Sequence, residues 1–293
     1  MVDSFLDPAG PVAMAQRSHL MAVVALTLVA VLPVIVLVPF ILWRYRSSNR
    51  KARYAPQWDR SGKLELLLWG VPFLIVTVLS VLLWRSTLEL DPYKPVGTET
   101  PLRVEVIGLD WKWLFLYPDL GIATVGELVL PARRPVQLTL TADTVMQSFI
   151  VPALAGQIYA MPGMTTRLNL EADAPGNFKG ANIQYNGAGF HAQRFRVKAL
   201  SVEDFSAWRQ QVRSSPTVLG QHNYAQLAQR STAVQAQEAF GMTGLPAGTL
   251  HFRLTDGGLF RRVLQRYRSG SPVSAARQPG SAVYAPEGEA GAR

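Results

Sequence analysis

The chain has 293 residues, of which 48% are hydrophobic and only 17% are charged, whereas about 25% of the residues in an average soluble domain are charged. Cysteine is absent, which excludes a disulfide framework, thiolate metal sites and a thiol nucleophile. Because the chain has only 4 histidines, a histidine-rich metal cage is not expected either.

The formal net charge of +9 comes mostly from two short stretches. Residues 43–63 hold seven basic residues and one acidic residue, giving +6, and residues 251–293 hold seven basic and three acidic residues, giving +4. Residues 101–201 hold nine basic and seven acidic residues, giving only +2. Nucleic acid binding requires a basic face on a folded domain, so this distribution argues against a nucleic acid partner.

Two apolar stretches near the N-terminus have the length of membrane spans. Residues 19–43 carry no formal charge over 25 residues, and residues 66–84 carry none over 19. About 20 apolar residues cross the hydrocarbon core as a helix, and Trp43 and Trp84 end the two stretches as interfacial aromatics often do. We therefore predict transmembrane helices over 19–43 and 64–85, preceded by an external segment, 1–18, and joined by a basic loop, 44–63.

The basic loop predicts the orientation of the chain. Short loops rich in lysine and arginine stay on the cytoplasmic side of a bacterial membrane. Both termini and residues 85–293 are then expected on the outer, periplasmic side of a bacterial inner membrane. The basic residues of this exported part do not contradict the prediction, because long domains escape the rule.

After a linker, 86–100, residues 101–201 are typical of an all-β domain. Apolar and polar residues alternate at 103–107, 136–141, 164–170 and 195–200, with glycine and proline between these stretches. Several short alternating strands separated by turns indicate a β-sandwich or barrel. We predict a sandwich here, followed by a helical extension, 202–269, and a disordered tail, 270–293, rich in glycine, serine, proline and alanine.

Two helices are expected in the extension. The first covers 203–212, with Phe205, Trp208 and Val212 on one side. The second covers 259–267, with an apolar face flanked by arginines, which fits either a helix on a membrane surface or, more simply, a helix packed against the sandwich.

Several sequence segments together resemble subunit II of the haem-copper respiratory oxidases. The segment at 7–10, DPAG, and that at 16–18, QRS, resemble the quinol-oxidase branch of that family. The resemblance covers about residues 5–213 and, more weakly, 258–268. The other matching segments are LDWKWLF at 109–115, VMQSFIVP at 145–152, QIYAMPG at 157–163 and KLELLLWGVP at 63–72.

The resemblance implies a cupredoxin-like sandwich, which in the cytochrome c oxidase branch holds a two-copper centre. That centre needs two bridging cysteines, two histidines, a methionine and a backbone carbonyl, because the coppers share an electron through soft thiolates. His191 lies one position from the place of the second histidine, so a one-residue slip would align it, but both sulfurs would still be missing. The residues at these places are Gln147, Gln184, Asn186, Ala188, Ala192 and Phe195, and we therefore expect no metal in this chain.

A subunit II without the copper centre resembles that of oxidases whose electron donor is a quinol. The resemblance then implies a non-catalytic subunit II of a proton-pumping ubiquinol oxidase, with haems and copper in subunit I, further membrane subunits, and ubiquinol as the substrate of the complex. Docking of basic cytochrome c is not expected, because residues 101–201 have no acidic excess. The alternatives are a membrane-anchored cupredoxin-like binding module and a cytochrome c oxidase subunit II.

Two further expectations follow from the resemblance. Glu65, at the cytoplasmic start of the second span, matches an acid near a proton path into subunit I, although an ordinary helix-start acid favoured by the helix dipole is the alternative. Trp111, Trp113 and Phe115 alternate as on a strand, and we interpret them as packing against the catalytic subunit or the membrane interface.

Overall fold

The computed structural model describes residues 4–51, 55, 57–255, 257–268 and 272–285. The chain divides into two compact units, one formed by residues 15–91 and the other by residues 1–14 together with 92–293. Parts of the expected N-terminal segment (1–3), basic loop (52–54 and 56), extension (256 and 269) and tail (270–271 and 286–293) lie outside the described residues.

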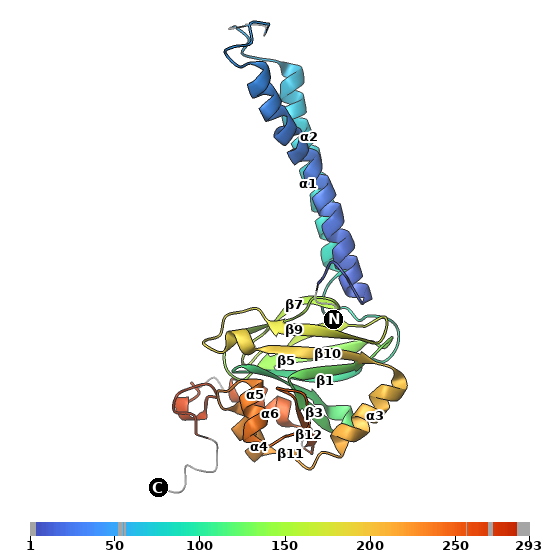
Figure 1. The fold of residues 1–293 in the computed structure, drawn as a ribbon, viewed down its shortest axis with the longest axis vertical. Helices are drawn as coiled ribbons and strands as arrows, with labels where there is room; N and C mark the ends of the chain where they lie inside the picture. The colour runs from blue at the N-terminus through green and yellow to red at the C-terminus, as the bar shows by residue number, and fades with distance from the viewer. Residues whose placement is uncertain (1–3, 52–54, 56, 256, 269–271, 286–293) are drawn as a thin grey trace. The chain divides into compact units, whose positions relative to one another are not determined.

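Two long helices, α1 (Pro11–Arg44) and α2 (Gly62–Glu89), account for most of the first unit. They run antiparallel as a hairpin (Figure 1), and the Ser86 hydroxyl lies 2.7 Å from the ring Nδ1 of His19. Both are long and apolar enough to cross a membrane, and apolar side chains such as Leu66 and Phe73 are each 75% exposed. The described helices contain and extend the predicted spans at both ends.

The second unit is built on a β-sandwich, which confirms the predicted fold class. One sheet has seven strands in the order β11-β12-β3-β2-β1-β5-β8, and the other has five in the order β4-β10-β9-β6-β7. Strand β1 pairs in parallel with β5, and β4 with β10, whereas β1–β2 and β9–β10 are antiparallel. The strands of the sandwich proper are β1 (Leu102–Leu109), β2 (Lys112–Tyr117), β3 (Ile122–Val125), β4 (Glu127–Pro131), β5 (Val136–Ala142), β6 (Gln147–Val151), β7 (Ala155–Ala160), β8 (Thr166–Leu170), β9 (Gly176–Asn182) and β10 (Arg194–Leu200).

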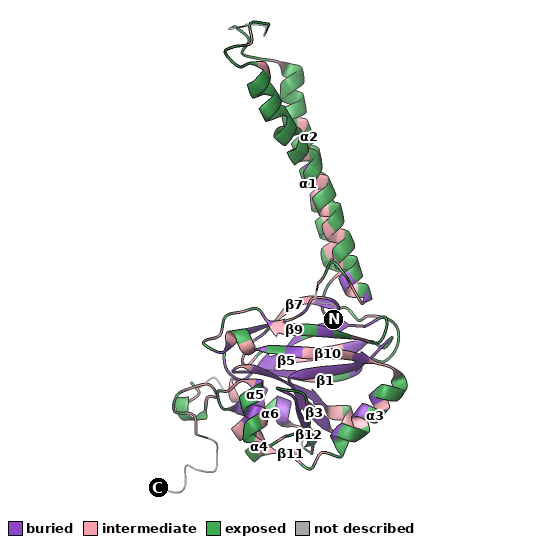
Figure 2. Cartoon of the chain, in the orientation of Figure 1, coloured by how far each residue is buried: buried purple, intermediate pink, exposed green. Residues whose placement is uncertain are grey.

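The alternating stretches of the sequence form strands because one side of each can face the space between the sheets. The buried side chains there form the main core (Figure 2). Helix α3 (Val202–Arg213) closes one edge of this core with Phe205, Trp208 and Val212, as its spacing predicts. The Trp208 ring meets Tyr117 at 5.5 Å between ring centroids.

The C-terminal extension covers the outer face of the seven-stranded sheet. It contains the helices α4 (Gln221–Ala228), α5 (Ala233–Ala239) and α6 (Leu259–Arg266), and also two strands that the sequence analysis missed, β11 (Val218–Leu219) and β12 (Leu250–Leu254). Strand β12 pairs with β3, so the extension continues the sheet and is not purely helical.

A second apolar core lies between this extension and the sheet. Ile107 and Leu116 from the sheet meet Leu227, Phe252 and Val263 from the extension. The apolar face of α6 is therefore covered by protein, which confirms the packed helix and leaves no apolar face for a membrane surface.

The described part of the tail, residues 272–285, is ordered against the domain, so the expectation of disorder is wrong for these residues. It contains a short 3-10 helix, Ala275–Arg277, and Tyr284 packs against the second core. Little in the composition of the tail indicates this, because it is rich in glycine, serine, proline and alanine and Tyr284 is its one aromatic residue.

Candidate functional site

A cluster of amide side chains lies at and beside two of the positions that correspond to copper ligands, Gln147 and Asn186. Gln147 begins β6, is fully buried, and donates hydrogen bonds from Nε2 to the Thr144 hydroxyl (3.0 Å) and the Leu109 carbonyl (3.3 Å). Its Oε1 accepts a hydrogen bond of 2.6 Å from Nε2 of Gln193, just before β10. Two segments 46 residues apart in the sequence are thus joined by amide groups.

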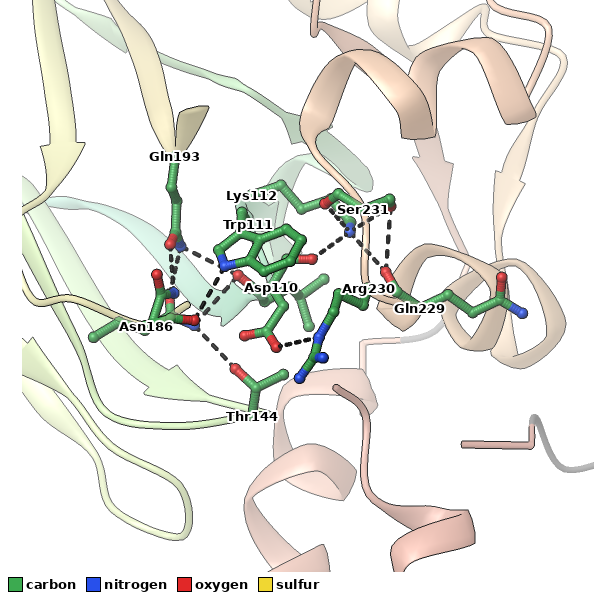
Figure 3. Close-up of polar contacts among 11 residues, drawn as sticks. Asp110, Trp111, Lys112, Thr144, Asn186, Gln193, Gln229, Arg230 and Ser231 are labelled. Carbon is green, nitrogen blue, oxygen red and sulfur yellow. Dashed lines mark hydrogen bonds and ion pairs between the residues drawn. The ribbon is translucent and has the colours of Figure 1, made fainter. Parts of the chain in front are cut away.

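Gln193 is the centre of this cluster, and the sequence analysis did not single it out. Its Nε2 also donates to the Leu109 carbonyl at 3.2 Å, and its Oε1 accepts from Nδ2 of Asn182 (3.0 Å) and of Asn186 (2.7 Å). Figure 3 shows Gln193 and Asn186 converging beside Trp111. No pattern in the sequence marks Gln193, because its role depends on a contact with Gln147, 46 residues away.

The other residues at ligand positions are dispersed. Phe195 points into the main core, where its ring stacks on Phe149 with 5.0 Å between centroids. Ala188 is exposed and Ala192 half-buried, whereas Gln184 uses its backbone to bond the Asn182 side chain.

His191, the candidate for a one-residue slip, is exposed on the short 3-10 helix Phe190–Ala192.

Trp111 holds the loop between β9 and β10 against the turn between β1 and β2. Its ring nitrogen donates a hydrogen bond of 3.1 Å to the Asn186 carbonyl. A side chain at Gly189 would overlap the Trp111 ring, so that position accommodates only glycine without a shift. The guanidinium of Arg230, from the extension, lies 5.6 Å from the Trp111 ring centroid and 3.4 Å from Asp110 Oδ2. Arg230 therefore makes a cation–π contact with the Trp111 ring.

Lys112 ties this turn to the extension from inside the domain. Its ammonium Nζ donates to the carbonyls of Asp110 (3.0 Å), Gln229 (2.9 Å) and Ser231 (2.8 Å) and to the Ser231 hydroxyl (2.9 Å), as Figure 3 shows. Burial lowers the pKa of Lys112 to about 7, although the nearby Asp110 charge opposes the shift. The backbone oxygens satisfy the buried nitrogen, so this group has a structural role in joining the two parts.

Comparisons with known proteins identify the family of this chain. The family described as "Cytochrome C oxidase subunit II, periplasmic domain" matches residues 120–197. Cytochrome bo(3) ubiquinol oxidase subunit 2 of Pseudomonas putida is 44% identical over 229 residues, covering 78% of this chain and 73% of that relative. Ubiquinol oxidase subunit 2 of Acetobacter aceti is 38% identical over 268 residues, covering 90% of this chain and 83% of that relative.

The chain belongs to the ubiquinol oxidase subunit 2 family. Among solved structures, the periplasmic domain of subunit II of the cytochrome oxidase of Bradyrhizobium japonicum matches 40% of this chain and 96% of that chain, with 20% identity and a TM-score of 0.38.

A two-copper centre, as in the cytochrome c oxidase branch, does not fit the residues present in this member of the ubiquinol oxidase subunit 2 family. The donors that converge are the neutral amides of Gln147 and Gln193, already bonded to one another and to backbone oxygen. Amides are weak ligands for copper, and the chain has no thiolate to bridge two metal ions.

The expected interface role of two aromatic residues is wrong. Trp113 and Phe115, on β2, are 1% and 0% exposed and pack in the main core against Phe149 and Phe195. Trp111 lies in the turn before β2 and is half-buried against the loop between β9 and β10. The alternation seen in the sequence correctly indicates one face of a strand, but that face is the inner one.

Glu65 lies in the first turn of α2, as the sequence predicts. Its carboxylate is 3.6 Å from Nε of Arg60, and both side chains are well exposed, at 49% and 81%. An exposed ion pair of this kind contributes little to stability. The contact with Arg60 is therefore not a sufficient reason for a glutamate at position 65.

Proposed function

We propose that this chain is the non-catalytic subunit II of a proton-pumping quinol:oxygen oxidoreductase of the aerobic respiratory chain. The observation that carries the proposal is the Gln147–Gln193 amide pair in a member of the ubiquinol oxidase subunit 2 family: Gln147 stands at one copper-ligand position, and Gln193 lies one residue beyond another. A quinol dissolved in the membrane can deliver its electrons directly to a partner subunit. The sandwich then needs no metal and serves as a structural domain.

The partners follow from the same proposal. Subunit I would hold the haems and copper and oxidise ubiquinol, and further membrane subunits would complete the complex. The near-neutral sandwich region, with +2 over residues 101–201, supports an assembly that does not dock basic cytochrome c. Cytochrome c oxidase subunit II is the less favoured alternative, because the electron entry of that branch needs the copper pair.

The loops around the amide cluster are the surface that we assign to subunit I. Val145, Met146, Ile183 and Tyr185 are 48%, 41%, 48% and 72% exposed. The two loops are adjacent, because the Ile183 amide donates to the Ser148 carbonyl at 3.2 Å. A cluster of exposed large apolar side chains is typical of a protein contact. We therefore assign the contact with subunit I to these side chains and not to Trp113 and Phe115, which are buried.

The two apolar helices and the basic loop support a multi-pass chain in a bacterial plasma membrane, with the β domain and both termini periplasmic. Helix α2 would then begin on the cytoplasmic side. Glu65 would lie at that surface, where a carboxylate can collect protons for uptake by subunit I.

Purification of the tagged chain from native membranes tests the proposal. We expect a haem-bearing polytopic partner to co-purify, oxygen consumption with ubiquinol but not with reduced cytochrome c, and no purple thiolate–copper absorption. Activity with cytochrome c would favour the alternative branch, and isolation of the chain without any haem protein would favour a freestanding binding module.

A further inference from the structure

A groove of about 360 Å³ lies where the C-terminal extension meets the β9–β10 edge of the amide cluster. One wall carries three basic residues, Lys179 of β9 and Arg194 and Arg196 of β10. The rest is lined largely by small apolar groups, among them Ala192 and Val234. The groove therefore combines positive charge with an apolar surface.

The two arginines on this wall, Arg194 and Arg196, have no counter-charge at ion-pair distance within the described residues. Lys198 continues the row of Arg194 and Arg196 along β10, and the neighbouring strand β4 contributes one carboxylate, Glu127. That carboxylate is already bonded to Lys198 Nζ at 2.9 Å and to His251 Nε2 at 2.6 Å. Within the described part of the chain, no carboxylate lies at ion-pair distance from Arg194 or Arg196.

Arg196 is held in place by neutral groups only. Its Nη2 donates to the Ala247 carbonyl (3.3 Å) and to the Thr249 hydroxyl. Its Nε is buried without a hydrogen-bond partner among the described residues. Partly burying a guanidinium without a counter-charge is costly, and the usual solution is a carboxylate that takes two of its hydrogen bonds. The guanidinium is thus held at the groove by neutral oxygen acceptors and has no counter-charge at ion-pair distance among the described residues.

We infer that the groove receives an aspartate or glutamate side chain of a partner polypeptide of the oxidase, with a small apolar neighbour against Ala192 and Val234. This inference rests on the proposed function and names the chemistry of one contact in the complex. A polypeptide is favoured over a free anion because most of the groove surface is apolar.

Cross-linking in the purified complex tests the occupant directly. A photo-reactive phenylalanine at Val234, which is 44% exposed, should capture a peptide of a co-purifying subunit that contains an acidic residue at or next to the linked position. Capture of lipid alone, of no polypeptide, or of a peptide without an acid would overturn the inference.

Exchanging the charges of the two residues tests the proposed contact between Arg196 and an acidic side chain of the partner. Arg196→Glu should raise the rate at which the partner dissociates in a salt wash by about tenfold or more, and replacement of the captured acid by arginine should restore retention. Arg103→Glu, on the exposed part of β1, is the matched control and should have no effect. Thermal unfolding of each isolated full-length variant checks that folding is intact.

The outcomes separate this inference from the proposed function. If the parent chain retains no haem-bearing partner, the proposed function fails. If the parent retains it and Arg196→Glu and Arg103→Glu retain it equally well, only the assignment of the groove fails.

Discussion

Arg266 donates hydrogen bonds from Nη1 to both carboxylate oxygens of Asp143, each at 2.8 Å. Asp143 follows β5 of the sandwich and is fully buried, whereas Arg266 ends α6 of the extension. Tyr224 of α4 donates to the same carboxylate, and Tyr267 donates to the Asp143 carbonyl. One buried acid thus fastens α4, α6 and the residue after α6 to the sheet.

Replacing Arg266 by glutamine should destabilise the second unit. The buried Asp143 carboxylate would lose its counter-charge, and removal of one partner from such a pair costs about 3 kcal/mol. We expect a lower thermal unfolding temperature for the full-length chain in detergent. Arg103→Gln, at an exposed position, should leave it unchanged, and equal midpoints for the two variants would contradict the role given to the pair.

The amide cluster should be sensitive to loss of a single polar side chain. Gln193→Met keeps the length of the side chain but leaves the amides of Gln147, Asn182 and Asn186 without their shared partner. Each buried unsatisfied group costs about 1–3 kcal/mol, so the free energy of unfolding should fall by about 2 kcal/mol or more. Gln211→Met, exposed on α3, is the control. A neutral result at Gln193 would show that the cluster is not what holds the loops together.

The strands of the sandwich could be predicted from the sequence because alternation reports directly which side chains face the space between the sheets. Strand β12 could not, since its pattern of buried residues is nearly continuous and only pairing with β3 and cover from α6 make it a strand. The same limit applies to Trp113 and Phe115. Periodicity shows that they share a face of β2, but not whether that face is inner or outer.

The candidate site was only partly predictable. Ligand positions can be counted along the sequence, so Gln147 could be identified. Gln193 could not, because its importance depends on a contact across 46 residues. Lys112 and Arg230 are likewise joined to the cluster through the extension, where spacing in the sequence gives no indication of a contact.

Glu105 should give a distinct pH dependence of stability. It lies on β1, where burial raises its pKa to about 7, opposed by Arg261. Between pH 4.5 and 7 the folded state therefore binds more protons at this group than the unfolded state, so stability from Glu105 is lost as the pH rises through this window. Glu105→Gln should leave the unfolding temperature unchanged near pH 4 and raise it near pH 8. A constant difference between the two proteins at all pH values would contradict the assignment.

The absence of cysteine allows a clean test of topology. A cysteine at the exposed position Ser48, in the basic loop, should react with a membrane-impermeant maleimide only after the inner membrane is opened. A cysteine at Ala207, exposed on α3, should react in intact spheroplasts. Labelling of both positions from the same side would refute the proposed orientation.

Glu65→Gln tests the proposed part in proton uptake. In the proposed topology α2 begins on the cytoplasmic side, and Glu65 lies in its first turn. An ionised carboxylate at that surface attracts protons and can pass them to a buried polar chain, whereas an amide of the same size cannot titrate. Assembly should survive, because the exposed ion pair with Arg60 contributes little.

Turnover of the assembled Glu65→Gln complex with ubiquinol should fall several-fold at most, since a surface acid is one proton collector among several and Asp59 is close in sequence. The loss should grow as the pH rises, because surface groups that collect protons matter most when the proton concentration is low. Glu89→Gln, at the exposed other end of the same helix, removes the same charge on the opposite side of the membrane and should leave turnover unchanged. If both variants turn over like the parent across pH with haem content intact, Glu65 is an ordinary helix-start acid stabilised by the N-terminal dipole of α2.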